Sequence, residues 1–173
     1  INRISTLEEL DTGKLDLGIG VFDQGQIHHK RRPLYTDSFL CLFNPAQLNY
    51  SPPISLEDYL NVPHVLTSLT EDAHGAVDEA LAKLKLKRTI ALTTPGFLAV
   101  PFVVRRAPVI TTMPSRLARY FAEAFGLATS PTPIELPTFT ISLLWHASFD
   151  HDPGHVWLRQ TVSGLASEVG LEL

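Results

Sequence analysis

The sequence predicts an α/β fold, because two kinds of segment alternate along most of the chain. Some segments are rich in apolar and β-branched residues, as strands are, and others repeat apolar residues at helical spacing. Proline and glycine residues separate many of them and indicate turns. The chain of 173 residues is 45% hydrophobic and has a net charge of −4, which is typical of a folded globular protein.

A short helix and a strand are expected first. Residues 6–12 are acidic and consistent with a helical turn or two, which Gly13 would end. Residues 14–22 carry apolar side chains in near-continuous order, as a strand buried on both faces would. Gly18 and Gly20 within it would let another backbone or a ligand come close.

The middle of the chain is expected to alternate strands and helices. Ser55 is a good N-cap for a short helix, and the apolar residues of 76–86 share one helical face. Residues 97–104 favour a helix kinked at Pro101, although their β-branched residues would also suit a strand. Strands are predicted at 34–43, 64–67, 88–94 and 107–113.

The last third continues the pattern. Pro114 opens a helix that runs to Phe125, and residues 138–145 alternate as a strand does. Asp152–Pro153 marks the start of a final helix, whose Trp157 is expected to pack and whose Arg159 is expected to form a surface ion pair. The first strand and the last strand–helix pair could share one sheet, and the middle of the chain another.

Composition excludes several classes of protein. No apolar run approaches the roughly 20 residues that cross a membrane. The pI near 5.9, without a basic cluster, argues against nucleic-acid binding by this segment. The single Cys41 lies in an apolar strand and excludes an internal disulfide framework.

Metal and cofactor sites are not expected. His28 and His29 fall in a polar loop, and adjacent side chains point in different directions, so a solvated loop is favoured over a metal clamp. His151 and His155 are four residues apart, but His151 precedes the helix start and no glutamate follows it. Position 23 is aspartate where a third glycine would complete a dinucleotide-binding loop.

Strand ends are the best candidates for ligand contacts, because ligands of open α/β sheets bind beyond the carboxyl ends of strands. Each candidate also has a structural explanation. The aromatic ring of Phe22 would line a ligand site or belong to the core. The hydroxyls of Thr67 and Ser68 would hold a carboxylate or carbonyl, or cap a helix. Thr94 and Phe97 bracket a Pro-Gly turn and would offer a hydroxyl and a ring, or cap and pack the next segment.

His146 ends the last predicted strand. Its imidazole would hydrogen-bond an acid or a phenol, or form a structural bond into the following turn.

Five stretches together resemble the effector-binding domain of LysR-type transcriptional regulators. Residues 13–20 resemble the strand G-x-L-D-L-A-I-G of that family, and residues 33–39 are similar to its crossover strand. Residues 54–58 resemble its hydrophobic-S-L-x-D helix, and residues 113–118 its P-x-x-L-A helix. Residues 145–159 resemble the pattern W-H-x-R-x-x-x-D-P-x-x-x-W-L-R of the branch that includes nodulation and aromatic-degradation regulators. Ser148 replaces the basic residue of that pattern, and Pro101 is unexpected in its helix.

The resemblance implies two Rossmann-like lobes of periplasmic-binding-protein type 2 architecture, joined by two crossover strands that act as hinges. Lobe one would comprise residues 1–26 and 115–173, and lobe two residues 34–112. A small organic effector, aromatic or carboxylated, would bind in the cleft to Phe22, Thr67, Ser68, Thr94, Phe97 and His146.

The resemblance further implies a cytoplasmic bacterial regulator that is a homodimer or homotetramer and not an enzyme, with no cofactor. It would bind DNA only through an N-terminal helix-turn-helix domain absent from this chain, and the first strand and helix of the regulatory domain would be absent too. A free-standing solute-binding protein of the same fold is an alternative. An enzyme, for instance with a prephenate-dehydratase-like activity, is another, but no acid–base pair at compelling spacing supports it.

Overall fold

The computed structural model describes residues 3–22, 27–68 and 75–171, and contacts divide the chain into two units. The first unit is formed by Ile1–Asp37 and Phe139–Leu173, and the second by Ser38–Thr138. The α/β class predicted from the sequence is confirmed, since both units combine a sheet with helices.

The first unit contains a small antiparallel sheet of strand order β1-β8-β2. Its strands are β1 (Gly18–Gly20), β2 (His29–Asp37) and β8 (Phe139–His146). As predicted, the first strand pairs with the last strand in one sheet, and the last helix belongs to the same unit. The register places His29 opposite His146 and Asp37 opposite Phe139.

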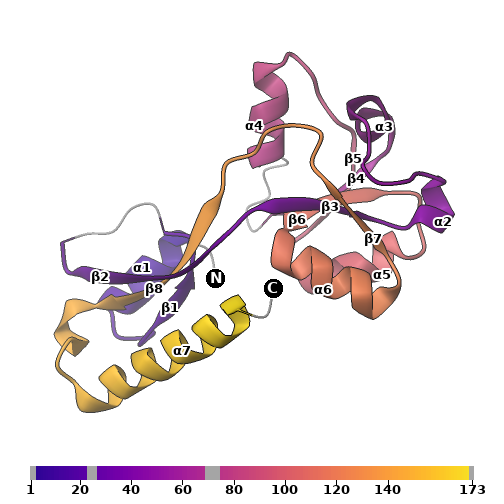
Figure 1. Cartoon of the computed structure of the whole chain (residues 1–173). Helices are drawn as coiled ribbons and strands as arrows, with labels where there is room; N and C mark the ends of the chain where they lie inside the picture. The colour runs from indigo at the N-terminus through magenta and orange to yellow at the C-terminus, as the bar shows by residue number, and fades with distance from the viewer. Residues whose placement is uncertain (1–2, 23–26, 69–74, 172–173) are drawn as a thin grey trace. The chain divides into compact units, whose positions relative to one another are not determined.

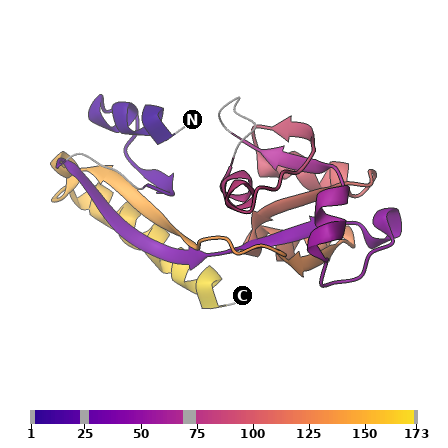
Figure 2. The same cartoon turned by 90° about the horizontal axis from the view of Figure 1, so that it is seen from above.

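Helices cover both faces of this sheet (Figures 1 and 2). Leu144 of β8 packs with Leu10 of α1 (Arg3–Asp11). The next residue, Trp145, contacts Arg159 of α7 (Pro153–Leu171). The Cζ atom of the Arg159 guanidinium lies 4.6 Å from the centroid of the Trp145 ring. Because successive strand side chains point to opposite faces, α1 and α7 cover opposite sides of the sheet.

The second unit is built on a mixed sheet of strand order β5-β4-β6-β3-β7. Strand β4 is parallel to β5 and β6, and β3 is antiparallel to β6 and β7. The strands are β3 (Phe39–Phe43), β4 (His64–Thr67), β5 (Ile90–Thr94), β6 (Ile110–Pro114) and β7 (Ala128–Pro131).

The helices of the second unit follow local sequence signals. Ser55 accepts a hydrogen bond from the Asp58 N–H and caps α3, and Gly126 ends α6 in the left-handed conformation. The helices are α2 (Pro45–Leu48), α3 (Leu56–Asn61), α4 (Ala76–Lys83), the 3₁₀ turn η1 (Phe97–Ala99), α5 (Val100–Val104) and α6 (Ser115–Phe125).

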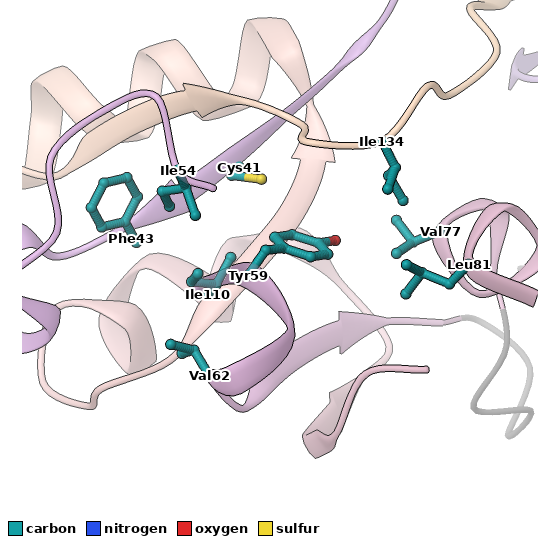
Figure 3. Close-up of a cluster of buried hydrophobic side chains, with 9 residues drawn as sticks. All are labelled: Cys41, Phe43, Ile54, Tyr59, Val62, Val77, Leu81, Ile110 and Ile134. Carbon is teal, nitrogen blue, oxygen red and sulfur yellow. The ribbon is translucent and has the colours of Figure 1, made fainter. Parts of the chain in front are cut away.

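Two apolar clusters occupy the two faces of the larger sheet. Cys41 and Phe43 of β3 join one cluster and Leu42, between them, joins the other. Tyr59 lies in the middle of the first cluster (Figure 3), which receives Val77 and Leu81 from α4. The second cluster is covered by α5 and α6.

Three predicted boundaries differ from the structure. The opening strand is shorter, since β1 is an edge strand of three residues with Ile19 59% exposed, not a strand buried on both faces. The predicted strand 34–43 is divided at Ser38, and its first part begins earlier, at His29. Pro101 does not kink a helix, because it stands in the first turn of α5, where its missing N–H needs no partner.

The division into units also differs from the predicted lobes of 1–26 with 115–173 and 34–112. Strand β2 pairs with β8 and therefore belongs to the first unit. Helix α6 belongs to the second unit, because Ala118 and Phe121 pack into its core. Within the described ranges, no helix combines the length and the apolar character that a bilayer crossing needs.

Candidate functional site

Three of the predicted ligand contacts come together in the second unit. Thr67 ends β4 and is the register partner of Thr94, which ends the parallel strand β5. The Ser68 N–H donates a hydrogen bond to the Thr94 carbonyl at 3.0 Å. Two parallel strands therefore end side by side here, and both ends carry hydroxyl groups.

The hydroxyl of Thr67 is the most informative group at these strand ends. Its Oγ1 atom is shielded from solvent and has no hydrogen-bond partner among the described residues. A buried hydroxyl without a partner costs about 1–3 kcal/mol, so such a group is uncommon unless another molecule satisfies it. Thr67 is thus able to donate to, or accept from, a polar ligand atom.

Thr94 and Phe97 also carry out the structural roles foreseen for them. The Thr94 hydroxyl donates to the Gly96 carbonyl at 3.3 Å, a long bond that closes the turn. Phe97 begins η1, is partly buried and packs against the cluster beneath α5 and α6. Its ring therefore supports the core next to the strand ends.

Phe22 is part of the core of the first unit. It is 7% exposed and packs with Leu10 and Leu144. A Cβ atom added to Gly18 or Gly20 would lie 3.3 or 3.4 Å from the Phe22 ring. The close approach that these glycines permit is therefore made by the Phe22 side chain.

His146 makes the structural bond into the following turn. Its Nδ1 lies 2.7 Å from Ser148 Oγ and 3.2 Å from the Ser148 nitrogen, at the start of η2 (Ala147–Phe149). Its ring also lies 5.1 Å from that of His28 and 6.3 Å from that of His29, between centroids.

The expectation of a solvated, divergent His28–His29 pair is wrong. Nε2 of His28 and Nε2 of His29 lie 2.9 and 2.8 Å from the same atom, Asp11 Oδ1, and the His29 side chain is fully buried. Desolvation raises the pKa of Asp11, but the hydrogen bonds and charges of His29 and His28 outweigh it and bring that pKa below its ordinary value. Sequence reasoning did not single out Asp11, because only the start of β2 at His29 brings these residues together.

The last helix corrects two further expectations. Trp157 is 66% exposed, whereas Arg159 is buried and donates hydrogen bonds to the carbonyls of Phe149 and Asp150. Arg159 Nη1 also donates to His155 Nδ1, and His155 Nε2 donates to the Asp16 carbonyl, both at 2.7 Å. Both ring nitrogens of His155 are thus occupied by the fold.

The buried polar side chains of the second unit are suited to structure and not to nucleophilic chemistry. Burial raises the pKa of the Cys41 thiol to about 12 and that of the Tyr59 hydroxyl to about 12. Tyr59 Oη and Cys41 Sγ both lie within hydrogen-bond reach of Thr112 Oγ1, at 2.8 and 3.9 Å. Both groups therefore stay protonated near pH 7, and they serve as hydrogen-bond partners of Thr112 and not as nucleophiles.

The two sheet-and-helix units, with hydroxyl groups at the ends of parallel strands, define a ligand-binding domain of α/β class. The chain belongs to the LysR substrate binding domain family, which residues 2–166 match. The relatives reported below are transcriptional activators, which argues against the enzymatic alternative.

Relatives and solved structures agree with this family. The chain is 34% identical to the HTH-type transcriptional activator NagR of a Ralstonia species, covering 93% of this chain and 54% of NagR. It is 31% identical to the activator NahR of Pseudomonas putida, covering 96% of this chain and 56% of NahR. The chain therefore spans about half the length of these relatives.

The crystal structure of a transcriptional regulator from Vibrio parahaemolyticus superimposes with a TM-score of 0.87 at 26% identity. The superposition covers 99% of this chain and 79% of that one. The structural likeness confirms the predicted architecture of periplasmic-binding-protein type 2.

Proposed function

We propose that the chain is the sensing part of a cytoplasmic bacterial transcription regulator and that its effector is a small aromatic or carboxylated molecule. The family fixes the coarser statement, an effector-binding regulatory domain. The observation that supports an aromatic or carboxylated effector is the buried Thr67 hydroxyl, which has no hydrogen-bond partner among the described residues. A carboxylate or phenolic oxygen is a suitable partner for this group.

The neighbouring groups support an oxygen-rich ligand. Thr94 holds its hydroxyl in a long bond to Gly96, which a better acceptor would replace. Ser68 adjoins Thr67 at the same strand end. Phe22 and His146, from the first unit, remain predicted effector contacts.

The effector would act by shifting a pre-existing equilibrium between arrangements of a homodimer or homotetramer. The output would be a change in DNA binding or transcription, delivered by a helix-turn-helix domain that lies outside these residues. The two curated activators of about twice this length are consistent with such an additional domain.

A thermal-shift screen of the chain tests the proposal, using aromatic acids, phenols, amino acids and sugars. A ligand at 100 times its dissociation constant would add about 2.7 kcal/mol to the free energy of unfolding. The aromatic acids or phenols are expected to stabilise the chain, whereas stabilisation by sugars alone would contradict the proposed effector class.

A matched pair of variants identifies the site. Thr67→Val removes the unsatisfied hydroxyl at constant shape, so it is expected to weaken effector binding about tenfold or more while the free chain becomes about 1 kcal/mol more stable. Thr93→Val, on the exposed neighbour of Thr94, is expected to leave affinity unchanged. Equal affinities of the wild type and Thr67→Val would remove Thr67 from the site.

A further inference from the structure

Three segments far apart in the sequence bring four metal-binding side chains together in the first unit. Asp11 is the last residue of α1, and His146 is the last residue of β8. His29 begins β2, and His28 directly precedes that strand. These four residues are called the histidine cluster below. His29 lies directly opposite His146 in the antiparallel pair of β2 and β8, and this register brings the residues of the cluster together.

The ligand atoms of the cluster are close together. One carboxylate oxygen or ring nitrogen from each of Asp11, His28 and His146 lies within 4.8 Å of the others. Both His28 and His29 direct Nε2 at Asp11 Oδ1, at 2.9 and 2.8 Å. Bonds of 2.0–2.1 Å in a tetrahedral site place ligand atoms about 3.4 Å apart, which is more than the 2.9 Å between His28 Nε2 and Asp11 Oδ1 and less than the 4.8 Å limit for the three residues.

We propose that Asp11, His28 and His146 bind a divalent transition-metal ion such as Zn²⁺, with His29 orienting the carboxylate. Imidazole nitrogens with one carboxylate oxygen suit Zn²⁺, Ni²⁺ or Cu²⁺, whereas Mg²⁺ and Ca²⁺ prefer oxygen ligands alone. Three protein ligands leave a fourth position for water or another ligand. The inference does not depend on the proposed effector.

The surroundings of the ligands fit this assignment. A metal-bound histidine is commonly held in orientation through its other ring nitrogen, and His146 Nδ1 accepts the Ser148 backbone N–H at 3.2 Å and lies 2.7 Å from Ser148 Oγ. His29 is fully buried and holds Asp11 Oδ1 from the protein side. The side chains of Asp11 and His28 are 35% and 34% exposed, so an ion can reach the site from solvent.

A purely structural cluster is the competing explanation. The same hydrogen bonds join the end of α1 to the start of β2 without any ion. The two explanations predict different results when metal is added to the chain. A metal site binds one ion with an affinity that depends on each ligand residue, whereas a purely structural cluster does not.

Isothermal titration of Zn²⁺ into the tag-free, chelator-treated chain tests the proposal. We expect one ion per chain, and we expect Asp11→Asn, His28→Gln and His146→Gln each to weaken binding by about 100-fold or more. His29→Gln is expected to weaken it about 10- to 100-fold, as removal of an outer-shell partner does. His151→Gln, an exposed histidine of the same unit outside the cluster, is the matched control and is expected to bind as the wild type does.

A second readout separates metal ligation from folding defects. Co²⁺ added to the wild-type chain is expected to show the visible absorption of a four-coordinate site with nitrogen and oxygen ligands, and circular dichroism reports whether each variant is folded. The proposal is overturned if the wild type binds Zn²⁺ no more tightly than a folded His28→Gln/His146→Gln double variant, or if His151→Gln loses as much affinity as the ligand variants do.

Discussion

Arg88 and Asp78 form a two-point ion pair in the second unit. Arg88 Nε and Nη2 donate hydrogen bonds to Asp78 Oδ1 and Oδ2 at 2.9 and 2.8 Å. Asp78 Oδ2 also accepts the N–H of Gly75 at 3.0 Å, at the start of α4. The Arg88 side chain is only 2% exposed, so this pair fastens α4 to the segment that leads into β5.

Loss of this ion pair is predicted to destabilise the chain. Arg88→Met should lower the free energy of unfolding by about 3 kcal/mol, because it leaves the Asp78 carboxylate without its counter-ion. Urea unfolding at neutral pH measures the change. Arg119→Met, at an exposed position of α6, is the control and should change stability by less than about 0.5 kcal/mol. A similar small effect for both variants would mean that solvent replaces the pair at no cost.

His64 is predicted to make stability depend on pH. Its side chain is buried, its Nε2 donates to the Tyr59 carbonyl at 2.7 Å, and burial lowers its pKa from 6.5 to about 4. Between these two values the unfolded chain binds a proton that the folded chain does not. Stability should therefore be highest above about pH 6.5 and fall by about 3 kcal/mol as the pH drops to about 4.

Unfolding of the wild type and of His64→Gln, measured at neutral pH and at about pH 4.5, isolates this contribution. Glutamine keeps a side-chain N–H donor but does not titrate. The wild type should lose more stability on acidification than His64→Gln does, and parallel losses would assign the pH dependence to other groups.

Cys41 is predicted to be unreactive in the folded chain. Its pKa is raised from 9.0 to about 12 by burial, which reduces the thiolate fraction at mildly alkaline pH about a thousandfold. Alkylation by iodoacetamide at about pH 8 should be slow in the native chain and fast in urea. Rapid native alkylation at a rate independent of stability would show that the thiol is accessible.

Two glycines are predicted to respond oppositely to alanine. Gly126 ends α6 with φ of 64°, a conformation that costs an L-residue about 1 kcal/mol, so Gly126→Ala should destabilise the chain. Gly164 is exposed within α7 and has open space at its Cβ position, so Gly164→Ala should stabilise it by about 1 kcal/mol. Thermal unfolding of both variants measures the difference, and changes of the same sign would contradict it.

Local signals in the sequence predicted the elements whose ends are set by single residues. Strand β4 has the predicted bounds, and Gly126 ends α6 where expected. The Asp152 side chain accepts the N–H of His155 at 2.7 Å, as an N-cap of α7 does. These features depend on residues that are close in sequence, so they can be predicted from the sequence alone.

Features that depend on pairing between distant segments were not predictable in the same way. The sequence predicts a polar loop at His28 and His29, yet His29 begins β2, because β8 supplies the hydrogen-bonding partner of that strand. The same pairing gathers the histidine cluster, although Asp11 and His146 are distant in sequence. Of the predicted contacts, Thr67, Ser68 and Thr94 meet because β4 and β5 are parallel neighbours, which alternation of strands and helices favours.

The strand order β1-β8-β2 affects how the chain matures on the ribosome. The strand in the middle of the first sheet is the last to be synthesised, so β1 and β2 emerge without the neighbour that both require. The second unit, in contrast, is one continuous stretch from Ser38 to Thr138 and is complete before β8 leaves the exit tunnel. Nascent chains should therefore acquire their inserted domain first, while the β1 and β2 edges remain open to chaperones until translation has passed His146.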